Sequence, residues 1–287
     1  MKIRIGTRKS KLAIVQTQMV ALKIREEFPD IEIEIVHIST TGDKILDKPL
    51  TAIGGKGVFV SEIEKALLNS EIDIAVHSAK DLPVNLAEGL EISGVLKRGN
   101  YRDTFVTKRN RKTENNSAFT VGTGSLRRRL NLQKICPDVS FKDIRGNVDT
   151  RLNKLENGEY DAIILAAAGL ERLGFHKDER FDFKFFDYNE FLPAPCQGII
   201  AIESRQNDFV TPITKQINDE KTFFSFETEK YILKLLNADC GMPLGAYSFI
   251  ENNKISLVLS TNGKNNVMGV DNVSKRFELV KEMILKL

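Results

Sequence analysis

The sequence contains an internal duplication, and this duplication limits the folds that the chain can adopt. Residues 3–10 (IRIGTRKS) and 119–129 (FTVGTGSLRRR) each bring a short apolar run to Gly-Thr, followed by a serine and an amphipathic stretch. Both copies then pass through Pro-Asp, at 29–30 and at 137–138, and end in a further apolar run. Strands that alternate with helices pair in parallel and carry the helices on the sheet faces. The duplication therefore predicts two similar α/β lobes.

The two copies differ where chemistry is expected. Ligands of open α/β sheets bind beyond the carboxyl ends of the strands. The first copy leaves its last strand through residues 77–81 (HSAKD), whereas the second leaves through 166–168 (AAA) and carries arginines instead. The sequence thus places an acid in one lobe and cations in the other.

Composition narrows the class of protein. The 287 residues are enough for two or three domains with apolar interiors, and 41% hydrophobic with 28% charged residues is typical of a globular chain. No stretch approaches the roughly 20 apolar residues of a spanning helix, and the start enters a strand directly, so we expect a cytoplasmic protein with no membrane partner. The net charge of +3 lacks the basic excess typical of nucleic-acid binders. Any anionic ligand must therefore be held by a local cluster of cations.

We expect three domains along the chain. The first lobe comprises residues 1–97 together with 198–218, because the apolar run at 198–203 (GIIAIE) is expected to cross back and complete its sheet. The second lobe spans residues 102–193, and the charged segment 97–103 is expected to link the lobes. The chain would then cross between the two lobes twice, and two crossings would form a hinge. Residues 219–287 are predicted to form a small α+β domain.

Two glycine motifs do not match nucleotide sites. Gly54-Gly55-Lys56-Gly57 lacks the earlier glycine of a P-loop and the Ser or Thr after its lysine, and Gly122-Thr-Gly124 lacks the third glycine of a dinucleotide fingerprint. The long stretch 40–57 is predicted to be a binding loop or lid.

Arginines gather in the second lobe. Arg127, Arg128 and Arg129 are expected on the first turn of a helix that Ser125 opens, although the dipole of a helix favours anions at that end. A solvated surface is the plain interpretation of any one arginine. Guanidinium forks bind carboxylates and phosphates, so the group favours a polyanionic ligand. Arg8 occupies the matching position in the first copy.

Asp81 follows a strand, and Pro83 stiffens the residues after it. A turn-forming aspartate or an ion pair with Lys80 is as plausible locally as catalysis. A carboxylate near cations could stabilise a positively charged intermediate or transfer protons.

Cysteine and histidine usage argues against metals and disulfides. The three cysteines are widely spaced without a CxxC pair, and three histidines are too few for a His-based metal centre, so no metal is expected. Cys136 is predicted to be structural. Local reasoning leaves open whether Cys196 or Cys240 is the modified thiol.

Taken together, these segments resemble the hydroxymethylbilane synthase (porphobilinogen deaminase) family over nearly the whole chain. The matching stretches are GTRKSKLAIVQ at 6–16, GDKILDKPL at 42–50, IGGKGVFVSEIEKALL at 53–68, DIAVHSAKDLP at 73–83, GTGSLRRR at 122–129, RGNVDTRLNKLENGEYDAIILAAAGLERLG at 145–174, LPAPCQG at 192–198 and ADCGMPLGAY at 238–247.

The resemblance implies an enzyme with two periplasmic-binding-protein-like lobes. Such an enzyme deaminates four porphobilinogen molecules, joins them head to tail, and releases linear hydroxymethylbilane by hydrolysis. The resemblance also implies a dipyrromethane cofactor, assembled from substrate and bound through a thioether to Cys240, with Asp81 as the catalytic aspartate.

The resemblance also assigns further residues of the cleft. The residues that it implies for the cofactor are Cys240, Lys80, Ser78, Asp43, Thr123, Ser125, Arg127 and Arg128. Those that it implies for the substrate are Arg8, Ser10, Gln16, Lys56, Arg145, Arg151, Arg172, Gln197 and Gly198. The implied partner is porphobilinogen alone, with the chain acting as a monomer.

Two other functions are compatible with parts of the pattern. A non-enzymatic, two-lobed anion-binding protein of the periplasmic-receptor type would also use duplicated lobes and a hinge, but it predicts a secreted chain with no use for Cys240. A nucleic-acid binder built on residues 127–129 is disfavoured by the balanced charge and the lack of interleaved aromatic residues.

Overall fold

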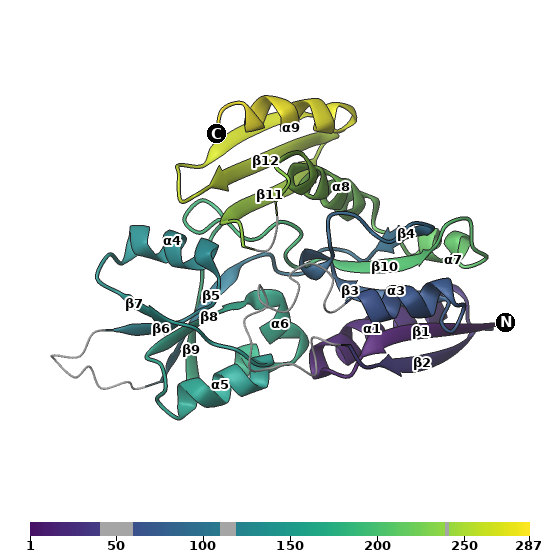
Figure 1. Ribbon diagram of the computed structural model, residues 1–287, viewed down its shortest axis with the longest axis horizontal. Coiled ribbons are helices and arrows are strands. Elements are labelled where there is room, and N and C mark those ends of the chain that lie inside the picture. The colour runs from purple at the N-terminus through teal and green to yellow at the C-terminus, as the bar shows by residue number, and fades with distance from the viewer. Residues whose placement is uncertain (41–59, 110–118, 239–240) are drawn as a thin grey trace. The chain divides into compact units, whose positions relative to one another are not determined.

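The computed structural model describes residues 1–40, 60–109, 119–238 and 241–287 (Figure 1). The chain divides into two compact units. The first consists of Met1–Gly99 with Ile199–Asp239, and the second consists of Asn100–Gly198 with Cys240–Leu287.

A five-stranded sheet in the order β2-β1-β3-β10-β4 forms the centre of the first unit. β1 pairs in parallel with β2 and β3, while β10 is antiparallel to β3 and β4. The strands are β1 (Lys2–Arg8), β2 (Glu32–Ile38), β3 (Ile74–Ser78), β4 (Leu90–Val95) and β10 (Ile200–Arg205). The helices are α1 (Lys11–Glu27), α3 (Ser61–Leu68), α7 (Thr211–Gln216) and α8 (Glu220–Leu235), with a 3-10 turn η2 (Ala79–Asp81) after β3.

The second unit contains a sheet in the order β7-β6-β8-β5-β9. β6 is parallel to β7 and β8, and β5 is antiparallel to β8 and β9. The strands are β5 (Asp103–Lys108), β6 (Thr120–Gly122), β7 (Ser140–Lys142), β8 (Ala162–Ala166) and β9 (Phe181–Phe185). The helices are α4 (Leu126–Ile135), α5 (Val148–Glu156) and α6 (Ala167–Arg172), followed by η3 (Phe175–Lys177).

The two sheets have the same topology, which confirms the two similar lobes that the duplication predicts. β1, β2 and β3 correspond in order and direction to β6, β7 and β8. In each sheet the fourth position is an antiparallel strand supplied from beyond the repeat: β10 returns after the second copy, and β5 precedes it. The return of residues 198–203 to the first sheet is thereby confirmed.

The repeated Gly-Thr has a packing reason in both sheets. A Cβ on Gly6 of β1 would collide with the Ile72 side chain, and a Cβ on Gly122 of β6 would lie 2.8 Å from the Tyr160 ring. Real Cβ atoms do not make contacts this short, so a side chain at Gly122 would displace the Tyr160 ring, and one at Gly6 would displace the tip of Ile72. Glycine lets both strands pack closely without these shifts.

A separate three-stranded antiparallel sheet belongs to the second unit. It has the order β11-β12-β13 and is followed by η4 (Val273–Lys275) and α9 (Arg276–Ile284). Its strands are β11 (Leu244–Glu251), β12 (Lys254–Thr261) and β13 (Val267–Asn272). α8, which we expected within a domain spanning 219–287, is grouped with the first unit. The division into three domains stays a prediction.

Candidate functional site

The first unit gathers predicted site residues at one edge of its sheet. Arg8 ends β1, Ser10 caps α1, and Ser78, Lys80 and Asp81 follow the parallel neighbour β3. Because the carboxyl ends of parallel strands meet at one edge, the acid and Arg8 share the side of the sheet where ligands bind in such folds.

Gln16 and Ser78 are joined by a side-chain pair. Gln16 is buried on α1, and its Nε2 donates to Ser78 Oγ at 2.8 Å. Ser78 Oγ also lies 3.1 Å from Gln16 Oε1, to which it can donate in return. This pair fixes the start of α1 against the end of β3.

Backbone and side-chain bonds hold the turn that carries Asp81. The N–H of buried Ala79 donates to the Ile199 carbonyl at 3.0 Å, and Lys230 Nζ of α8 donates to the Leu82 carbonyl at 2.8 Å. Asp81 itself is exposed. The carboxylate is therefore presented to solvent from a turn that is fixed on both sides.

A buried pair braces β3 against β10 directly before this turn. His77 Nε2 lies 2.9 Å from Glu203 Oε2, and Glu203 is fully buried. Both side chains come from adjacent antiparallel strands, with Ala201 opposite His77. The pair ties the exit of β3 to the strand that crosses back.

In the second unit, Thr123 and Ser125 form the start of α4. The Ser125 N–H donates to Thr123 Oγ1 at 3.2 Å, and Ser125 Oγ accepts from the Arg128 N–H at 3.5 Å. Thr123 is buried. Ser125 is thus the N-cap that the sequence predicted.

Arg127 and Arg128 are buried, and they share a carboxylate that the sequence analysis did not identify. Arg127 Nη1 donates to Asp103 Oδ2 at 2.7 Å, and Arg128 Nε donates to Asp103 Oδ1 at 2.9 Å. The solvated-surface interpretation is therefore wrong for these two arginines. The anion expected near the first turn of α4 is, in part, this internal aspartate.

Three further arginines of the prediction also lie in the second unit. Arg151 Nε donates to the Gly146 carbonyl at 2.7 Å, and Arg172 Nη2 donates to the Gly198 carbonyl at 2.6 Å. Burial lowers the pKa of Arg172 to about 10, against the opposing charge of Glu171, so Arg172 still carries its charge at neutral pH. Arg145 follows β7, and its carbonyl accepts a bond from Lys154.

Gln197 and Gly198 lie in the segment that leads back to the first sheet. Gln197 is buried, and its Nε2 donates to the Tyr101 carbonyl at 2.8 Å. Gly198 adopts φ 89°, a left-handed conformation that suits glycine. In this structure both residues shape the tight turn before β10.

The thiols differ in accessibility. Cys196 is fully buried and has φ 61°, while Cys136 is exposed at the end of α4. Asp43, Lys56 and Cys240, together with residues 41–57 of the predicted loop, lie outside the described residues.

Asp103 was missed because its contacts are distant in the sequence. It lies 24 and 25 residues before its two partners. Residues 103–108 (DTFVTK) contain only two apolar residues, and these are adjacent, so no apolar alternation marked this segment as a strand. The strand β5 starts at Asp103, which is the last residue of the charged segment 97–103 assigned as a linker.

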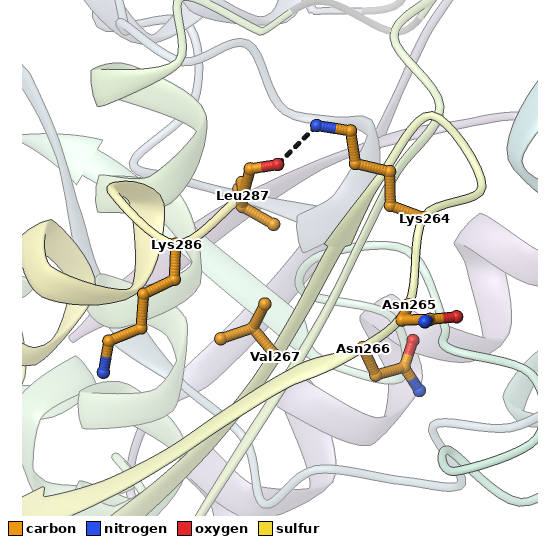
Figure 2. A pocket seen from close by; sticks show the side chains of 6 residues that line it. All are labelled: Lys264, Asn265, Asn266, Val267, Lys286 and Leu287. Carbon is orange, nitrogen blue, oxygen red and sulfur yellow. Dashed lines mark hydrogen bonds between the residues drawn. The ribbon is translucent and has the colours of Figure 1, made fainter.

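A hollow in the second unit is lined by none of these residues. It has a volume of about 480 Å³ and is lined by Lys264, Asn265, Asn266, Val267, Lys286 and Leu287 (Figure 2). Figure 2 shows Lys264 Nζ bonded to the backbone oxygen of Leu287.

The described residues contain no group of three His, Cys, Asp or Glu that could hold a metal. No helix within them is long and apolar enough to cross a bilayer.

Comparison with known proteins decides the family. The family model for "porphobilinogen deaminase, dipyromethane cofactor binding domain" matches residues 3–211. Porphobilinogen deaminase from Acetivibrio thermocellus is 45% identical over 92% of this chain and 90% of its own length. The enzyme of the same name from Rickettsia bellii is 46% identical over 88% of this chain and 85% of its own.

The chain belongs to the porphobilinogen deaminase family. As a porphobilinogen deaminase it is a transferase of tetrapyrrole synthesis that polymerises porphobilinogen, and dipyrromethane is its cofactor. This confirms the family resemblance of the motifs, and it sets aside the non-enzymatic binding protein and the nucleic-acid binder as the main function.

Solved structures with partial likeness include a double mutant of the BvgS VFT2 domain from Bordetella pertussis. It covers 80% of this chain and 91% of its own at 13% identity with a TM-score of 0.45. The alkanesulfonate-binding protein SsuA from Xanthomonas axonopodis pv. citri covers 82% and 75% at 14% identity, with a TM-score of 0.37.

Proposed function

We propose that this deaminase joins four porphobilinogen molecules head to tail on a primer bound to Cys240 and releases linear hydroxymethylbilane by hydrolysis. The observation that supports this most is the buried pair Arg127 and Arg128 at the start of α4. Both guanidiniums bond to the one carboxylate of Asp103, and the charges that act on Arg127 are this carboxylate and the cation of Arg128. Two cations and one anion leave one positive charge in excess. A carboxylate-bearing ligand would balance it.

The residues present fit dipyrromethane. Each pyrrole unit made from porphobilinogen carries an acetate and a propionate, and the Nε and Nη2 edge of Arg127 has no partner among the described residues. That edge offers two parallel N–H donors, the geometry that binds a carboxylate. Thr123, Ser125 and Arg128 belong to the same start of α4, and we assign these residues to the cofactor, together with Ser78, Lys80 and Asp43. When bound, dipyrromethane supplies the pyrrole carbon to which the first substrate is joined.

Cys240 is the thiol that we assign to the tether. Modification requires an accessible sulfur, and Cys196 is fully buried, so its thiol is closed to a pyrrole adduct. Cys136 is exposed, but it lies at the far end of α4 from the arginine pair.

Asp81 is the residue that we assign to catalysis. Loss of ammonia from porphobilinogen leaves a methylene-pyrrole cation, which an ionised carboxylate in a fixed position stabilises electrostatically. Asp81 is exposed on a turn held by Ala79 and Lys230, so it is free to meet substrate without reorganisation. The residues that we assign to the acid arms of the substrate and growing chain are Arg8, Ser10, Gln16, Lys56, Arg145, Arg151, Arg172, Gln197 and Gly198.

Asp81→Asn tests this assignment. The variant should retain its covalent cofactor and bind substrate, but ammonia release and tetrapyrrole formation should fall by about 10²- to 10⁴-fold, the usual contribution of a positioned acid or base. Glu88→Gln, which neutralises an exposed carboxylate in the same segment, is the matched control and should turn over normally. Near-normal turnover of Asp81→Asn would remove Asp81 from the mechanism.

We also infer that the enzyme works as a cytoplasmic monomer without nucleic-acid or membrane partners. The balanced charge supports the absence of a polyanionic macromolecular partner. Native mass spectrometry, which counts the chains in each particle, tests the monomer.

A further inference from the structure

Asp103 joins the two arginines at the start of α4 into one buried cluster. Its side chain has no exposed surface, and it contacts Arg127 Nη1 at 2.7 Å, Arg128 Nε at 2.9 Å and Arg128 Nη2 at 2.7 Å. A carboxylate can accept several such bonds because each oxygen carries two lone pairs. Asp103 thereby fixes the separation and orientation of both guanidiniums.

Carbonyl groups from two other segments complete the support. Arg128 Nη1 donates to the Ile164 carbonyl of β8 at 2.8 Å, and Arg127 Nη1 donates to the Leu192 carbonyl at 2.7 Å. Asp103 itself is placed by the sheet, because it begins β5 directly opposite Ala166 at the end of β8. The cluster is thus built on rigid elements rather than on a loop.

These bonds divide the two arginines into different roles. All three nitrogens of Arg128 contact Asp103 or Ile164. Arg127 uses only Nη1, and its Nε and Nη2 have no partner within the described ranges. The edge formed by those two atoms is the part of the cluster that remains available to a carboxylate.

The charges also fail to balance. Among the interactions that shift the pKa of Arg127, burial has the largest effect and lowers it, the Arg128 charge lowers it further, and Asp103 is the one acid that raises it. Two buried cations with one carboxylate are costly without a further anion. With Asp103 present, one bound carboxylate would balance the two cations. Without Asp103, two bound carboxylates would be needed.

We propose that Asp103 is a positioning residue for the cofactor: it holds the two guanidiniums and neutralises one of them, so that the free edge of Arg127 receives a single carboxylate arm of dipyrromethane. This inference rests on the proposed role of Arg127 and Arg128. It assigns to Asp103 no contact with substrate, because the carboxylate acts through the arginines.

The test measures cofactor loading in the full-length chain. Asp103→Asn keeps the size of the side chain but removes its charge, and intact mass after incubation with porphobilinogen gives the ratio of loaded to unloaded chain. We expect this ratio to fall about tenfold or more, since misplacing a charged hydrogen-bond partner weakens binding by that order. Asp182→Asn removes a carboxylate of the same sheet that pairs with Arg109 near the surface, and it should load normally.

Folding is separated from positioning by counting only native molecules. Native mass spectrometry selects chains with the compact charge states, so a variant that is merely less stable but folded would show normal loading. If Asp103→Asn yields no native chains, Asp103→Glu decides, since it keeps the charge but displaces the carboxylate by one methylene. Asp103→Glu should load less and raise KM more than it lowers kcat, and wild-type loading with an unchanged KM would overturn the proposal.

Arg127→Leu separates this inference from the proposed function. If Arg127→Leu fails to load while native Asp103→Asn loads like wild type, the positioning role is overturned and the proposed function stands. If Arg127→Leu loads normally, the arginine pair does not bind the cofactor, and the proposed function fails at that residue along with the inference.

Discussion

At the residue scale, the ion pairs of this deaminase differ sharply in how deeply they are buried. Asp73 accepts bonds from the Arg4 N–H at 2.8 Å and from Arg4 Nη2 at 2.7 Å, with Arg205 Nη2 at 3.6 Å. Burial alone would raise the pKa of Asp73, but the bonds and charges of Arg4 and the charge of Arg205 outweigh burial and lower it. Asp73 therefore stabilises the folded state while it is ionised.

This lowered pKa predicts a pH dependence of stability. A carboxyl whose folded pKa lies below its unfolded value of about 3.9 contributes stability above that pH and loses it as the pH falls through the folded pKa. Asp73→Asn should lower the free energy of unfolding by about 2 kcal/mol at pH 7. The difference from wild type should shrink below about pH 4, as urea unfolding at several pH values would show.

The control for Asp73 is an exposed pair of the same sheet. Glu32→Gln removes a partner of Lys2 at the surface, and surface pairs of this kind add little stability at any pH. A stability difference for Asp73→Asn that is constant from pH 7 to pH 3 would contradict the assigned ionisation.

Sequence reasoning at this scale identified charged residues but not their partners. Arg127 and Arg128 were found because three adjacent arginines at a helix start oppose the helix dipole. Asp103 and Lys230 were not found, since each acts through a contact with a segment remote in the chain. Local pattern carries no information about such pairs.

At the element scale, α4 begins without an acidic residue in its first turn and depends on Ser125 for its N-cap. Arg127 and Arg128 follow directly, so the same serine lies beside the cluster that we assign to the cofactor. Capping and ligand binding can be separated by choosing substitutions that affect one and not the other.

Ser125→Ala and Ser125→Asp make this separation. Removing the cap should cost about 1 kcal/mol of stability, whereas aspartate preserves a cap acceptor and suits the helix dipole. Ser125→Asp should nevertheless load less cofactor than wild type, because its carboxylate competes with the acid arm for the arginines. Thermal unfolding and intact mass are the two measurements.

Asp219→Ala is the capping control, because Asp219 caps α8 by accepting from the Thr222 N–H at 2.9 Å. It should lower stability without changing loading. If loading of all three variants simply follows their stability, Ser125 is a cap and nothing more.

Elements were predictable where their periodicity was strong. The apolar alternation of β1 and the apolar runs of β3 and β10 identify them as strands, and helical spacing identifies α1 and α8. β5 was hidden behind a charged run, and the edge strand β13 carries Gly269 and exposes Met268 and Val270. A short edge strand buries few side chains, so its sequence lacks the alternation of apolar and polar residues by which a strand is predicted.

At the scale of the whole molecule, duplication predicted the matching topology of the two sheets. The apolar run at 198–203, which had no partner strand in the second copy, predicted the return to the first sheet. Nothing in the sequence showed that β5 supplies the corresponding strand of the second sheet. Which lobe holds the acid and which holds the cations followed from the places where the copies differ. Placing the site residues individually required the family resemblance as well as the pattern.

The central claim is that Cys240 carries a covalent dipyrromethane whose acid arms the arginines hold. The intact mass of the purified, active enzyme tests it most directly. We predict a mass above that of the 32.3 kDa chain by two condensed pyrrole units, lost in Cys240→Ser and retained in Cys196→Ser. An unmodified mass in fully active enzyme, or an adduct that persists in Cys240→Ser, would contradict the account.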